Sequence, residues 1–401
     1  MRVGQAHFSL RPGGWSEWAP IVFEKDGKVF RRGMCRFYLA SARPDVELYA
    51  TPVQVDPLEP AFDISHPPAL AAELARRIGV FSTLGVPEDT NALRDGVLSA
   101  DAFLAQCEGV AAERERMLEH FLNGFDRGLL AFVFDTTDRI QHVFWSALDP
   151  EHPAHNDEFA RKYGGVIDDW YCRMDAIVGR IVSAAGDSAA VLVVSDHGFG
   201  SFRRAVHLNS WLVRNGFMAL RDESQRGRPF FRAVDWARTV AYAVGFTSVY
   251  LNLAGREGRG CVSRRDADMV IERLRSALRS LSDPENGNLV IKETYRGDRI
   301  YRGARAPEAP DLVIGYAPGY RASSQTAMGA CPASIIEPNT ESWPGDHLVD
   351  PTETPGVMFC NVGLAARAPS VMDVAPTVLS LLGLEADARM EGCALEVEAR
   401  G

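Results

Sequence analysis

The sequence predicts an α/β protein built on a mostly parallel sheet, with smaller segments attached to it. Short, continuously apolar runs recur along the chain, as in strands that are buried on both faces of a parallel sheet. Helical patterns separate these runs, which is the order of a βαβ arrangement. The composition, 46% hydrophobic and 24% charged in 401 residues, is that of a globular protein with two or three structural units.

The chain begins with two segments of different character. Residues 1–60 alternate apolar and polar positions between turn-forming residues, so we expect a β-rich inserted segment. Residues 61–127 change to a helical period, with helices expected at residues 69–78 and 99–122. Ser99 stands where it can cap the second helix. We expect this helical segment to pack on the core.

The core is expected in two parts, residues 128–201 and 294–401, with a cap or insertion at residues 202–293. Four apolar runs are its predicted strands: residues 128–134, 189–194, 311–315 and 357–360. Inside the insertion, Ser263 and Asp266 form a capping-box pattern. The helix that follows has one apolar face, made of Val270, Leu274, Leu278 and Leu281.

Metal-ligand side chains follow the first two predicted strands, where open α/β sheets bind ligands, and His347 stands before the run at 357–360. Asp138 and His142 are four residues apart on an expected helix and therefore share a face. Each motif alone also has a structural explanation: Asp138 with His142 is typical of a helix cap and a surface histidine. Together the five candidate side chains favour a catalytic Zn²⁺ or Mn²⁺ site without thiolates. They are Asp138, His142, Asp196, His197 and His347.

Composition excludes several other classes of protein. A net charge of -10 argues against duplex nucleic acid as the main partner. No apolar run approaches the ~20 residues of a membrane span, so we predict no membrane partner. The seven cysteines form no Cys-x-x-Cys motif, and the first residues lack a secretory leader, so we expect a cytoplasmic protein with reduced thiols.

Four segments in this order resemble the type I phosphodiesterase/nucleotide pyrophosphatase branch of the alkaline phosphatase superfamily. They are residues 134–142 (FDTTDRIQH), 194–198 (VSDHG), 345–347 (GDH) and 373–379 (DVAPTVL). The resemblance covers residues 128–395, less closely at 202–293. It implies a three-layer, mostly parallel sheet and hydrolysis of a small-molecule phosphate ester.

The resemblance also implies two divalent ions, most typically Zn²⁺, with Mn²⁺ as the alternative. Asp138, His142 and His347 would hold one ion. Asp196 and His197 would hold the second, together with another Asp and a nucleophilic Thr or Ser from an N-terminal strand. The two ions would activate the hydroxyl and stabilise the leaving oxygen. Four further residues are expected around the ligands: Asp135, Arg139, Asp346 and His207, the last with hydrogen-bonded packing as its alternative role.

The chain departs from the family pattern before residue 128, where neither that Asp nor the nucleophile is found. Thr51, Thr83 and Thr90 stand at turn or cap positions. Two hypotheses follow. The first is a phosphodiesterase or pyrophosphatase completed by a segment upstream of Met1 or by a partner chain; the second is an inactive metal-binding or regulatory homologue. We favour the first, because a protein that had lost catalysis would have no chemical reason to retain all five ligands.

Overall fold

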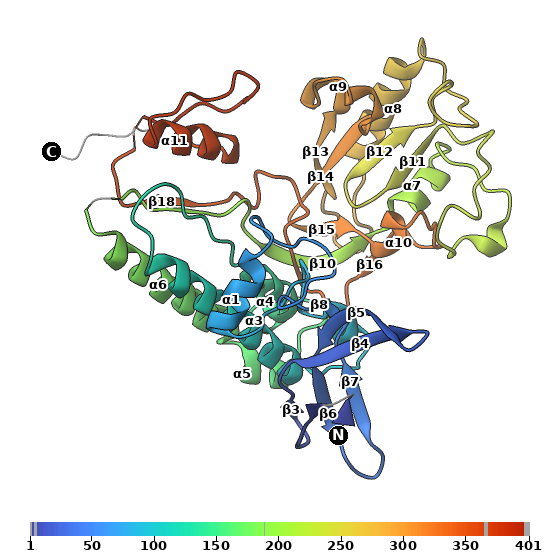
Figure 1. Ribbon diagram of the computed structural model, residues 1–401. Helices are drawn as coiled ribbons and strands as arrows, with labels where there is room; N and C mark the ends of the chain where they lie inside the picture. Colours follow the sequence, from blue (N-terminus) through green and yellow to red (C-terminus); the bar gives the residue numbers. More distant parts are fainter. Residues whose placement is uncertain (1, 4–5, 188, 365–367, 397–401) are drawn as a thin grey trace. The chain divides into compact units, whose positions relative to one another are not determined.

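The computed structural model describes residues 2–3, 6–187, 189–364 and 368–396, which form two compact units. The first unit comprises Met1–Gln141, Gly165–Val191 and Cys360–Gly401. The second comprises His142–Gly164 and Leu192–Phe359. Figure 1 colours the chain from blue at the N-terminus to red at the C-terminus and labels most of its helices and strands.

Antiparallel ladders account for the start of the first unit. One sheet has the order β4-β5-β8, another the order β3-β6-β7, and β1 pairs with β2. Asp26 and Gly27, with φ of 53° and 72°, form the tight turn between β4 and β5, a backbone conformation that an Asp-Gly pair adopts readily. The strands are β1 (Arg2–Val3), β2 (Ala6–His7), β3 (Gly14–Trp15), β4 (Ala19–Lys25), β5 (Lys28–Cys35), β6 (Phe37–Ser41), β7 (Glu47–Ala50) and β8 (Gln54–Val55).

Helices form the rest of the first unit. They are α1 (Leu70–Ile78), α2 (Thr90–Arg94), α3 (Ala100–Leu122), α6 (Val166–Ala185) and α11 (Val374–Leu381). The inner face of α3 is closed to solvent, with Phe103 and Cys107 each 0% exposed. On α3, Glu115 accepts hydrogen bonds from Arg173 and Arg180, both at 2.7 Å, which connects α3 to α6. The long helix is thus held by a buried apolar face and by ion pairs.

The N-terminus of α3 offers a direct test of helix capping. Ser99 adopts an extended conformation and its hydroxyl accepts a hydrogen bond from the amide of Ala102 at 3.2 Å. Replacing Ser99 with Ala leaves that amide without its acceptor, so we expect a loss of about 1 kcal/mol in the free energy of unfolding, measured with urea. Ser99→Asp keeps an acceptor and is expected to unfold close to the wild type.

A four-stranded antiparallel sheet organises much of the second unit. Its order is β11-β12-β14-β13, in the yellow and orange part of Figure 1. The strands are β11 (Ala241–Val244), β12 (Ser248–Leu251), β13 (Ile291–Arg296) and β14 (Leu312–Tyr316). Helix α8 (Ala267–Arg279) buries Leu274 and Leu278 completely in the same core. The apolar face predicted for this helix is therefore confirmed.

The remaining strands of the second unit carry the site. Strand β10 (Gly200–Val206) pairs in parallel with β15 (Gly319–Ala322) and antiparallel with β16 (Ile336–Pro338) and β17 (Gly345–Asp346). Strand β9 (Leu192–Val194) lies beside β18 (Met358–Cys360). The short helices are α5 (Asp157–Tyr163), α7 (Leu208–Arg214), α9 (Gly297–Ile300) and α10 (Ser324–Ala327). Strands β9 and β17 end at the predicted Asp-His pairs.

The described residues form the predicted mixed α/β architecture, but their ladders are mostly antiparallel, so a three-layer, mostly parallel sheet is not clear among them. The predicted strand at residues 128–134 is absent, since the backbone of residues 129–134 makes no hydrogen bond to any other described residue. The run at 311–315 does form a strand, β14, which pairs antiparallel with β12 and β13. An apolar run indicates burial, but its partner and direction depend on the strands beside it.

Within the described part of the chain, every helix is too short or too polar to cross a lipid bilayer.

Candidate metal centre

Helix α4 (Thr136–Phe144) carries two of the predicted ligands one turn apart, Asp138 and His142. The boundary between the two units falls within this helix, after Gln141. At its start, the hydroxyl of Thr136 donates a 2.6 Å hydrogen bond to the buried carboxylate of Glu88. Burial raises the pKa of Glu88, while this hydrogen bond opposes the increase. Asp138 itself pairs with the neighbouring Arg139.

The ring of His142 is buried and held on three sides. Its Nδ1 lies 2.7 Å from the carbonyl oxygen of Gly345 on β17. The indole of Trp343 stacks on it, with 3.9 Å between the ring centres. The ring of Phe199 meets it edge-on, with 4.7 Å between the ring centres. Because a carbonyl oxygen can only accept, Nδ1 carries the proton in this contact, and Nε2 is the ligand atom of the neutral ring.

His347 follows β17 and brings a second imidazole to the same place. Its ring centre is 5.3 Å from that of His142 and 3.6 Å from that of His197, to which it is nearly parallel. Burial and the like charge of His197 lower the pKa of His347 to about 4. The ring is therefore neutral near pH 7, which is the form that binds a metal ion.

Three of the five predicted ligands form one group. Ligand atoms of Asp138, His142 and His347 all lie within 4.8 Å of one another. Among the described residues, no other group of three or more His, Cys, Asp or Glu side chains is close enough together to hold a metal ion. One carboxylate and two imidazoles, without thiolate, suit a Zn²⁺ or Mn²⁺ ion with room for a further ligand.

Asp196 and His197 are not members of this group of ligand atoms among the described residues. They follow β9, as predicted, but the Asp196 side chain is 77% exposed. The Nδ1 atom of His197 lies 2.9 Å from the carbonyl oxygen of Gly198, and its Nε2 lies 3.7 Å from the Asp196 carboxylate. In the part of the chain that the structure describes, no third ligand joins this pair to complete a metal-binding group.

The four residues expected around the ligands have different surroundings. Asp135 directly precedes α4 and Arg139 lies within its first turn; one oxygen of Asp135 is buried without a hydrogen-bond partner among the described residues. Asp346 is 2% exposed and pairs with Arg321. His207 is buried, with Nδ1 2.8 Å from the Ser323 hydroxyl. That contact favours the packing role for His207.

Sequence reasoning missed the aromatic and cationic residues that hold the imidazoles. Phe199 directly follows the Asp-His-Gly motif, and Trp343 precedes Asp346 by three residues, so both positions were available as local signals. Arg321 is 25 residues from Asp346, and nothing in the sequence links the two. Burial would raise the pKa of Asp346, but the charge of Arg321 lowers it below its ordinary value.

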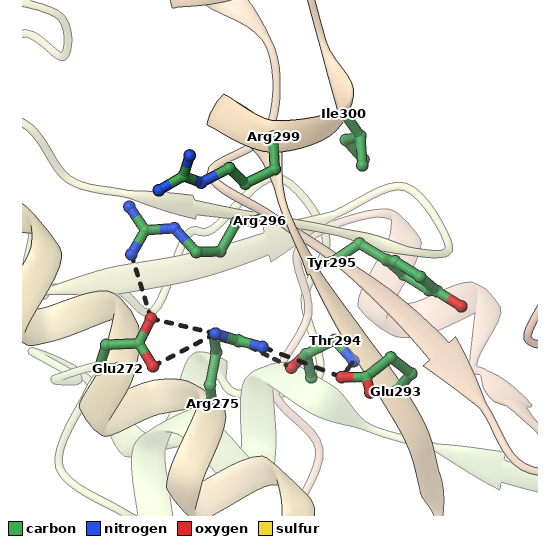
Figure 2. Close-up of a pocket in the computed structure, with 8 residues that line it drawn as sticks. All are labelled: Glu272, Arg275, Glu293, Thr294, Tyr295, Arg296, Arg299 and Ile300. Atoms are coloured by element: carbon green, nitrogen blue, oxygen red, sulfur yellow. Dashed lines mark hydrogen bonds and ion pairs between the residues drawn. The ribbon is translucent and has the colours of Figure 1, made fainter.

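An open cavity elsewhere in the second unit contains none of the predicted site residues. It is lined by Glu272, Arg275, Glu293, Thr294, Tyr295, Arg296, Arg299 and Ile300. Figure 2 shows Arg275 and Arg296 both reaching Glu272, each with a contact of 3.1 Å. Because these guanidinium groups are already paired with carboxylates, we assign no anionic ligand to this cavity.

A family model matches a long stretch of the chain. No curated protein matches the chain. Residues 88–347 match the family model described as type I phosphodiesterase / nucleotide pyrophosphatase, which belongs to the alkaline phosphatase superfamily. The match begins well before residue 128, includes the segment at 202–293, and contains all five predicted ligands. Since it spans well over half of the 401 residues, the chain belongs to the type I phosphodiesterase/nucleotide pyrophosphatase family.

Proposed function

We propose that the protein is a metal-dependent hydrolase of small-molecule phosphate esters, with a divalent ion held by Asp138, His142 and His347. The observation that carries this proposal is the convergence of one carboxylate and two imidazoles inside the stretch that matches the family model. Zn²⁺ is the ion that this donor set favours, with Mn²⁺ as the alternative.

The residues present fit such an ion. The Gly345 carbonyl fixes the ring of His142 through Nδ1, which orients Nε2 as a ligand. His347 is neutral near pH 7, so no proton has to leave it before it binds a metal. An ion bound here would supply Lewis-acid stabilisation of the charge that develops on the phosphoryl oxygens.

The chain's own residues would supply orientation and exclusion of water. Trp343 stacks on the His142 ring, Phe199 packs against it, and the ring is buried, so these aromatic side chains keep water away from this ligand. His197 stacks on His347 and thereby places a further imidazole beside the ligand group. We assign Asp196 and His197 to a second ion, whose remaining Asp ligand and hydroxyl nucleophile come from outside the described residues.

The first experiment measures metal content and hydrolysis together on the full chain from its native source. We expect at least one Zn²⁺ per chain by mass spectrometry of the eluted metal. We also expect metal-dependent hydrolysis of bis(p-nitrophenyl) phosphate, with p-nitrophenyl sulfate as the control ester. Metal uptake without hydrolysis of any phosphate ester would instead favour the inactive metal-binding homologue. A chain that takes up no divalent ion would overturn the proposal.

A further inference from the structure

We propose that Asp346, paired with Arg321, is a positioning residue that sets the geometry of both imidazole ligands. This inference rests on the proposed function, since it concerns the same metal centre. All the residues involved lie in the second unit.

Both oxygens of the Asp346 carboxylate accept hydrogen bonds. Oδ1 accepts from the backbone amides of His347 at 2.8 Å and Leu348 at 2.9 Å. Oδ2 accepts from the indole Nε1 of Trp343 at 3.1 Å and from the guanidinium of Arg321. One buried side chain therefore fixes the backbone from which the His347 ring projects.

The same carboxylate acts on His142 through two neighbours. It orients the indole of Trp343, which stacks on the His142 ring at 3.9 Å and 23°. Gly345, the residue before Asp346, presents its carbonyl oxygen to Nδ1 of His142 at 2.7 Å. The stack fixes the plane of the ring and the hydrogen bond fixes its rotation, so the direction of Nε2 depends on this short segment.

Arg321, the other member of the pair, is itself held in place by its neighbours. Its guanidinium lies between two aromatic rings, 4.2 Å from the centre of Phe202 and 4.6 Å from that of Phe246. Its Nε also donates to the carbonyl of Ala322 at 2.9 Å. The side chains of Arg321 and Asp346 are only 5% and 2% exposed. A charge in such surroundings has few alternative positions, which makes it a rigid anchor for the carboxylate.

A stabilising role alone would not require a charged pair at this position. The desolvation cost of a buried ion pair commonly cancels its Coulombic gain, so apolar residues of similar volume serve the fold equally well. Apolar residues cannot, however, accept hydrogen bonds from the amide of His347 and the indole of Trp343 at the same time. The geometry of the centre is therefore the property that needs Asp346.

Asp346→Asn tests the inference because it keeps one acceptor oxygen and places an amide donor toward Trp343 and Arg321. We expect the variant to bind Co²⁺, used as the probe, 10- to 100-fold more weakly than the wild type. We also expect its visible Co²⁺ absorption spectrum to change in position or intensity, because the ligand geometry changes. Calorimetric titration gives the affinity, and absorption spectroscopy gives the geometry.

Asp283→Asn is the matched control. Asp283 is a buried carboxylate of the same unit, paired with Arg204 at 2.8 and 2.9 Å and bound to none of the site residues named above. Its substitution should lower stability while leaving the Co²⁺ affinity and spectrum unchanged. Trp343→Phe is the second variant, because it keeps an aromatic ring for the stack and removes the Nε1–H donor together with part of the indole. We expect several-fold weaker binding from it, even if Asp346→Asn does not fold.

The outcomes separate the two proposals. A wild-type chain that takes up no Co²⁺ overturns the proposed metal centre and the positioning role with it. A wild type that binds Co²⁺, alongside folded Asp346→Asn or Trp343→Phe proteins with unchanged affinity and spectrum, overturns the positioning role alone. An equal loss of affinity in Asp283→Asn also overturns it, because the effect would then follow from stability.

Discussion

His142→Asn is expected to weaken the binding of Zn²⁺ or Co²⁺ by at least about 100-fold, because it removes an imidazole ligand from the centre of the group. Asparagine still offers an amide donor to the Gly345 carbonyl, so the contact that His142 makes at 2.7 Å has a replacement. The loss should therefore appear in metal affinity rather than in folding. Isothermal titration with each metal, on protein first stripped with a chelator, measures it.

His152→Asn is the control for this substitution. His152 is also a buried histidine of the second unit, and its Nε2 lies 2.7 Å from the carbonyl oxygen of Phe202. It belongs to no group of metal-ligating side chains among the described residues. Both variants lose a buried ring held by a carbonyl, but only His142→Asn should lose metal affinity. Equal metal affinities in the two variants would show that His142 is not a ligand of the centre.

Arg321→Met is expected to destabilise the fold by about 3–5 kcal/mol, because it leaves the carboxylate of Asp346 buried without its counter-charge. The sign of the pH dependence follows from the same pair. Arg321 lowers the pKa of Asp346 in the folded protein, so its stabilisation is present near neutral pH and is lost in acid, as the carboxylate takes up a proton. The difference in the free energy of unfolding between the wild type and Arg321→Met should therefore become smaller as the pH falls.

Arg305→Met is the matched exposed control. Arg305 pairs with Glu308 at 2.7 Å, but the two side chains are 86% and 64% exposed. A pair so accessible to water contributes at most about 1 kcal/mol, so the control should unfold close to the wild type. Urea unfolding of the metal-free proteins at several pH values compares the two. If Arg321→Met were as mild as Arg305→Met, the buried pair would not hold Asp346 in its charged form.

Local patterns predicted local structure well. The four-residue spacing of Asp138 and His142 placed both on one helix, and Ser99 does cap α3. These predictions succeed because the interactions concerned lie within one or two turns of helix. His347 was a weak candidate by itself, because the loop that carries it contains no periodic signal, and the family resemblance supplied its expected partners Asp138 and His142.

Contacts distant in sequence were beyond such reasoning. The run at residues 311–315 is apolar because β14 is buried, but β12 and β13 determine that it pairs antiparallel. The partnership of Arg321 with Asp346 arises only when β15 and β17 both flank β10. Each depends on which segments meet in three dimensions, and neither leaves a pattern in the neighbouring residues.

The apolar run at residues 129–134 has a consequence for how the protein behaves at high concentration. Leu129 and Val133 are 60% and 76% exposed, in a segment whose backbone forms no hydrogen bond with any described residue. An exposed apolar segment whose amides have no partner within the described structure can pair with an extended peptide from another molecule, which supplies both hydrogen bonds and apolar cover. This segment is therefore one place where self-association into intermolecular β-sheet can begin.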